Sequence, residues 1–182
     1  MFLLFSPSEH SAHVRYDLAL SLALQGAEGV QSLSRHVQRG LRASWHGYLP
    51  PGSCFITSLP SDVEGDRNQY GASSIAVLPT MRYVSDVRWH QDLVYNAMWC
   101  LLVEVRRWNA KLLAHRLGDT EGKPIKRVLM TGLGTGYGKV SAERCARQMI
   151  LATRHFAQGI PEKTNWENVD SIVQEVNHTL KM

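Results

Sequence analysis

The segment 128–149, VLMTGLGTGYGKVSAERCARQM, has the most distinctive pattern in the sequence. It opens with a short apolar run, continues through four glycines at alternate positions from 132 to 138, and then takes on helical spacing. A glycine costs roughly 0.5–1 kcal/mol in an ordered element, so this density needs a physical reason. We predict a buried strand at Val128–Met130, a glycine loop at its carboxyl end, and a following helix that Ser141 caps.

The rest of the chain alternates between short apolar runs and helically spaced apolar residues. The runs predict strands at residues 2–5, 53–57 and 75–78. The spacing predicts helices within residues 16–24, 30–41, 94–112, 142–156 and 169–180. A polar stretch at residues 61–72 has no period and predicts a surface loop.

This alternation predicts an α/β fold with a mostly parallel central sheet and helices on both faces. The length of 182 residues suits one domain. We place an α/β domain at residues 1–160 and a helical extension, packed on the same domain, at residues 161–182. Ligands of such sheets bind at the carboxyl ends of the strands, which is where the glycine loop falls.

Composition is that of a globular protein, with 44% hydrophobic and 20% charged residues and a net charge of +4. The basic residues are scattered, and the five tryptophans are interpreted as packing residues, so we do not expect nucleic-acid binding. The first residues, MFLLF, are too short to span a membrane and have no basic region before them. No membrane partner is predicted.

Three cysteines lie far apart in the sequence, without a CxxC pair. This pattern favours reduced thiols in an intracellular protein, cytoplasmic or nuclear, in which each cysteine serves as a small core residue. His10 and His13 are interpreted as solvated loop residues, because no carboxylate or thiolate cluster accompanies them. We therefore predict neither a metal nor a cofactor.

The glycine loop has chemistry of its own. Its amides and the N-terminal dipole of the next helix together favour an anion such as phosphate. A tight turn without a ligand is the alternative. The loop is not a Walker A motif, because Leu133 and Val140 stand where glycine and Ser or Thr are needed. It is not a dinucleotide fingerprint either, because Tyr137 takes the place of the third glycine.

The strand–loop–helix at residues 128–156 resembles the diphosphate-binding unit of macro domains, the ADP-ribose-binding family. Earlier pieces are similar in order: FLLFSPSE from Phe2, YDLALSLAL from Tyr16, PGSCFIT from Pro51 and IAVLPT from Ile75. The resemblance implies a three-layer α/β/α fold. It also implies a cleft that holds ADP-ribose, a related nucleotide diphosphate or an ADP-ribosylated protein.

Carried over by position, the resemblance implies a ligand site. Its residues are Ser6, Glu9, Tyr16, Thr131, Gly132, Gly134, Thr135, Gly136, Tyr137 and Gly138. The ring of Tyr137 would cover a ribose or pack over its own loop. Asp17 matches the position where hydrolytic members carry a carboxylate beside the distal ribose. A plain first-turn charge, stabilised by the helix dipole, is its alternative role.

The sequence also departs from the family pattern. Glu9 stands where active members carry asparagine, Ala12–Arg15 replaces a glycine run, and no counterpart of the family's preceding strand comes before Phe2. Three functions therefore stay open. The first is binding of ADP-ribose. The second is hydrolysis of ADP-ribosyl or O-acyl-ADP-ribose groups, with the water positioned either by Asp17 or by the substrate's own phosphates. The third is an interaction or scaffold domain with a degenerate cleft, which self-associates through its N-terminal strand.

Overall fold

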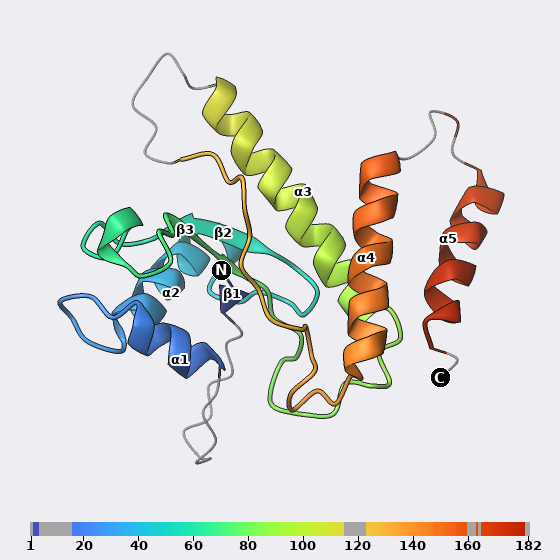
Figure 1. Ribbon diagram of the computed structural model, residues 1–182, viewed down its shortest axis with the longest axis horizontal. Coiled ribbons are helices and arrows are strands. Elements are labelled where there is room, and N and C mark those ends of the chain that lie inside the picture. The colour runs from blue at the N-terminus through green and yellow to red at the C-terminus, as the bar shows by residue number, and fades with distance from the viewer. Residues whose placement is uncertain (1, 4–15, 115–122, 160–162, 164, 181–182) are drawn as a thin grey trace.

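The computed structural model describes residues 2–3, 16–114, 123–159, 163 and 165–180. It combines helices with one small mixed sheet (Figure 1). The predicted combination of helices and strands is therefore confirmed. No helix in these described ranges is long and apolar enough to cross a membrane.

The sheet consists of β1 (Phe2–Leu3), β2 (Phe55–Ser58) and β3 (Ser74–Val77), in the order β1-β3-β2. Strand β3 pairs in parallel with β1 and antiparallel with β2. Three of the predicted strands thus exist, and β1 lies at an edge of the described sheet. A predominance of parallel pairing, a macro-domain topology and self-association through β1 stay predictions.

Helices pack on both faces of β3, because neighbouring side chains of a strand point to opposite sides. Ile75 and Val77 belong to one buried cluster with side chains of α1 (Tyr16–Ala23) and α2 (Ser32–Trp45). Ala76 belongs to a second cluster with side chains of α3 (Leu93–Ala114). Helices α1 and α2 therefore cover the opposite side of the strand from α3 (Figure 1).

A third cluster joins α3, α4 (Ala142–Gln158) and α5 (Trp166–His178). Its buried residues are Tyr95, Leu151, Ala152 and Val176. The predicted helices are thus all present. Two of the tryptophans were wrongly interpreted as packing residues, since Trp89 and Trp166 are 75% and 80% exposed.

The connection between β2 and β3 is a surface loop, as predicted, with a short 3-10 helix η1 (Gly65–Arg67) inside it. Asn68 holds it together. The Asn68 side-chain amide donates to the carbonyls of Val63 and Ala72 at 2.7 and 2.8 Å. Among the cysteines, Cys54 and Cys145 are buried as expected, and burial raises the pKa of both thiols.

The strand predicted at Val128–Met130 is wrong, because these residues form no ladder. No backbone hydrogen bond joins residues 126–131 to another residue in the described ranges, and Val128 and Leu129 are 39% and 55% exposed. The Asn109 side chain of α3 instead makes the two backbone hydrogen bonds that a neighbouring strand would make to Ile125. It accepts from the N–H of Ile125 at 2.8 Å and donates to its carbonyl at 2.9 Å.

His155 of α4 connects the three helices of the third cluster. Its Nδ1 lies 3.0 Å from the Tyr95 hydroxyl of α3, and its Nε2 lies 3.6 Å from a carboxylate oxygen of Glu175 on α5. Burial, and then the neighbouring Arg154, lower the pKa of His155 below its ordinary value of 6.5. The neutral ring is thus the form that the folded protein favours.

This environment predicts a loss of stability in acid. The pKa of His155 is lower in the folded chain than in the unfolded chain. Its contribution to the free energy of unfolding is therefore complete above the pKa of the unfolded chain, and it declines as the pH falls toward and through the pKa of the folded chain. We expect the urea midpoint to drop between about pH 7.5 and about pH 5.5, and to drop less in His155→Gln. Equal drops in the two proteins would remove His155 from the explanation.

Candidate functional site

The glycine loop, residues 132–138, lies at the carboxyl end of β3. Leu133 lies near the start of the loop and Val140 just after its end. Both share a buried cluster with Leu78, the residue after β3, and with Val87. Figure 1 shows the loop in orange beside the green connection that leads from β3 to α3. The two segments are bonded, since the Val87 N–H donates to the Gly138 carbonyl at 3.1 Å.

Part of the loop is a compact turn. The N–H of Lys139 donates to the carbonyl of Gly136 at 2.9 Å, and the N–H of Val140 to that of Gly134 at 3.1 Å. At the start of the loop, the Leu133 N–H donates to the sulfur of Cys145 on α4 at 3.1 Å. The first two bonds close the turn on itself, and the third fixes the start of the loop to α4.

Backbone conformation and crowding explain why two positions of the loop are glycine. Gly134 has a φ of +68°, a conformation that costs other residues roughly 1 kcal/mol or more. A Cβ at Gly138 would lie 2.5 Å from the Gly134 carbonyl oxygen and 2.8 Å from Val87. Gly136 is different, because a Cβ there would meet nothing within 4 Å. Neither crowding nor a positive φ explains glycine at that position.

The middle of the loop presents open amides. No residue in the described ranges accepts a hydrogen bond from the N–H groups of Gly134, Thr135 or Gly136. Thr135 and Gly136 are exposed. Helix α4 begins close by, where the Ser141 hydroxyl accepts from the Arg144 N–H at 3.2 Å, as predicted for an N-cap. Open amides beside a helix N-terminus form a suitable place for an anion.

Charged side chains beside the loop add a positive field. Asp86 pairs with Arg88 at 2.6 Å and lies 3.9 Å from the ammonium of Lys139. Hydrogen bonds from Arg88 lower the pKa of Asp86 to about 2, so its carboxylate stays ionised. Two cations therefore face one anion, and the group carries a net charge of +1 at neutral pH.

Arg144 fastens this charged group to α4. Its guanidinium donates to the backbone carbonyls of Arg88, His90 and Gln91 at 3.1, 2.7 and 2.7 Å. The connection between β3 and α3 is thereby held against the helix that follows the glycine loop. This role was not predicted from the sequence, because an arginine in a first helical turn has no distinctive pattern.

The predicted site residues fall into two groups. Residues 131–138 lie together, with Thr131 and Tyr137 exposed. Ser6 and Glu9, like His10 and His13, lie outside the described residues. Tyr16 and Asp17 open helix α1, and only their backbone is described.

Thr80, shortly after the end of β3, is a further polar residue that is not among the predicted site residues. It is 1% exposed, and its hydroxyl has no hydrogen-bond partner within the described part of the chain. Across the same ranges, no three His, Cys, Asp or Glu side chains gather where they could hold a metal ion. The sequence matches no family model and no curated protein.

The two kinds of glycine make a stability prediction. Gly138→Ala places a methyl group against a backbone carbonyl, so we expect it to lower the free energy of unfolding by about 1–3 kcal/mol. Gly136→Ala meets open space and should change it by less than about 0.5 kcal/mol. Urea titration of both variants checks this. Similar losses of unfolding free energy in the two variants would mean that Gly138 is not more crowded than Gly136.

Proposed function

We propose that the protein binds ADP-ribose or a related nucleotide diphosphate through the glycine loop. The observation that carries the proposal is that the N–H groups of Gly134, Thr135 and Gly136 have no hydrogen-bond acceptor in the described ranges and lie just before the N-terminus of α4. Thr135 and Gly136 are exposed, whereas Gly134 is buried. The wider part of the proposal is a three-layer fold of macro-domain type with a mostly parallel sheet. It is supported by the order of the sequence motifs and by the packing of helices on both faces of β3.

The proposed contacts follow from the charge of a diphosphate. Its oxygens accept hydrogen bonds only, and a hydrogen bond to a charged group contributes roughly 1.5–3 kcal/mol. The α4 dipole and the net positive group at Asp86, Arg88 and Lys139 favour the same ligand. Gly136 lets the main chain approach the oxygens, because no Cβ intervenes.

The parts of the nucleotide beyond the diphosphate are assigned by resemblance alone. Tyr137 would border a ribose, and Ser6, Glu9 and Tyr16 would complete the cleft. Hydrolysis would further need Asp17 to activate a water. No contact among the described residues favours turnover over binding, so the proposal is restricted to binding.

Calorimetry with ADP-ribose tests the proposal. We expect binding to the wild-type protein and a loss of affinity of about tenfold or more in Gly136→Val, because the branched side chain separates the amides from the phosphates. Ala146→Val is the control, since it introduces the same valine side chain at an exposed position of α4. Adenosine, which has no phosphate, should bind more weakly than ADP-ribose.

Two results would contradict the proposal. The first is no heat with folded wild-type protein at about 1 mM ADP-ribose, a concentration that detects even weak specific binding. The second is an affinity in Gly136→Val equal to that of Ala146→Val. A urea titration of each variant accompanies the calorimetry, so that unfolding is not mistaken for lost binding.

A further inference from the structure

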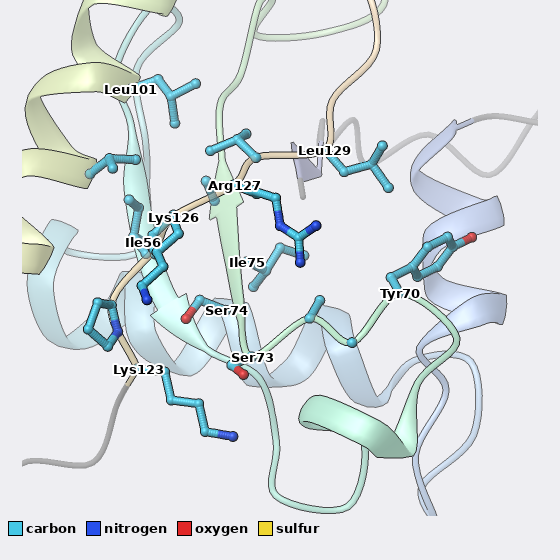
Figure 2. Close-up of a pocket in the computed structure, with 17 residues that line it drawn as sticks. Ile56, Tyr70, Ser73, Ser74, Ile75, Leu101, Lys123, Lys126, Arg127 and Leu129 are labelled. Carbon is cyan, nitrogen blue, oxygen red and sulfur yellow. The ribbon is translucent and has the colours of Figure 1, made fainter.

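A cavity of about 560 Å³ lies between the sheet and residues 123–129, the segment that leads to the glycine loop (Figure 2). Residues 70–76 line it along β3 and the turn before it, and residues 123–129 line the opposite wall. Its volume falls in the range of roughly 300–1,000 Å³ that is usual for small-molecule sites. The glycine loop does not line this cavity.

The inner wall is apolar. Ile56 of β2 and Ala76 of β3 meet Leu101 and Val105 of α3 there. The first three are buried and belong to the core cluster between the sheet and α3, with Val105 packed against them. This wall suits an aliphatic or aromatic body, which gains free energy by leaving water.

The outer wall is cationic. Lys123, Lys126 and Arg127 line the cavity, whereas no carboxylate does. None of the three makes an ion pair with a residue in the described ranges. Figure 2 shows the side chain of Arg127, one of the lining residues, extending from its segment toward β3 near Ile75. Three positive charges that pair with no carboxylate of the described ranges, beside an apolar wall, favour a negatively charged guest.

Strand β3 adds open main-chain groups. The Leu59 N–H donates to the Ser73 carbonyl at 2.9 Å, so the next pair along the ladder, Ser58 with Ser74, is a pair without hydrogen bonds. The backbone groups of Ser74 therefore face away from β2. Strand β1 begins only opposite Ala76, which leaves them without a strand neighbour in the described sheet. Ser74 lines the cavity and can offer its N–H to an anion.

The cationic wall is anchored at its two ends. The Trp108 indole N–H donates to the carbonyl of Lys123 at 3.1 Å, and Asn109 bonds both backbone groups of Ile125. At the other end, Met130 packs against the core cluster of the sheet and α3. A wall anchored at both ends lowers the entropic cost of ordering on binding.

We propose that this cavity is a second ligand site, which binds a small anionic amphiphile: an apolar body with a carboxylate or phosphate head. The body lies on the wall of Ile56, Ala76 and Leu101. The head lies at Arg127 and Lys126, within reach of the Ser74 main chain. This site is separate from the diphosphate loop and does not depend on the function proposed for it.

Calorimetry with two probes tests this site. Octyl phosphate and octanoate carry the two head groups on comparable apolar bodies, and the tighter of the two identifies the preferred head. Octyl glucoside has the body without the charge, and inorganic phosphate has the charge without the body. We expect each of these two controls to bind at least about tenfold more weakly than the better probe, because one lacks the charged head and the other lacks the apolar body.

Variants locate the binding. Arg127→Glu should weaken the better probe by about tenfold or more, and Arg127→Lys should retain most of the affinity. Arg39→Glu makes the same charge change at an exposed position of α2, which does not line the cavity, and should leave the affinity unchanged. Gly136→Val should also leave it unchanged, which separates this site from the glycine loop.

Three results would overturn the proposal. One is no binding of either anionic probe to the folded wild-type protein. Another is equal binding of octyl glucoside, which would mean that the cations take no part. The third is an equal loss in Arg39→Glu and Arg127→Glu, which would reduce the effect to the net charge of the protein.

Discussion

The helices of the protein are arranged around strand β3, which is buried on both of its faces. Ile75 and Leu78 are fully inaccessible to solvent, and they belong to the two different core clusters. A strand of four residues with apolar side chains on both sides cannot be stable unless helices cover each face. The positions of α2 and α3 follow from this requirement. The connection from β3 to α3 then brings Val87 to the glycine loop.

Periodicity in the sequence predicts much of this arrangement. The helical spacing at residues 94–112 predicts α3, and Ser141 is found as the predicted N-cap of α4. The apolar run at residues 75–78 predicts β3. The two apolar patterns report the burial of each residue's own side chain, and the cap reports a hydrogen bond within one helical turn. All of these are local properties. The sequence therefore predicts the elements reliably where they are long or fully buried.

What the sequence does not predict comes from contacts between distant residues. Val128–Met130 has the composition of a strand, yet the Asn109 side chain supplies the hydrogen bonds that a neighbouring strand would give to Ile125. Arg144 likewise holds the connection between β3 and α3 through the carbonyl of Arg88, a contact between residues more than fifty positions apart. The glycine loop itself was recognised from spacing alone. Its division into packed glycines and an uncrowded Gly136 needed three-dimensional neighbours.

The segment 123–131 connects the cavity beside the sheet to the glycine loop. Its backbone between residues 126 and 131 makes no hydrogen bond to the described part of the chain, while its ends are anchored at Asn109 and in the glycine loop. Such a bridge retains conformational freedom that a ladder would remove. A ligand in the cavity that orders this segment would lower the conformational entropy that is lost when a second ligand binds at the glycine loop. Two occupants would then favour one another without any change of shape, as dynamic coupling requires.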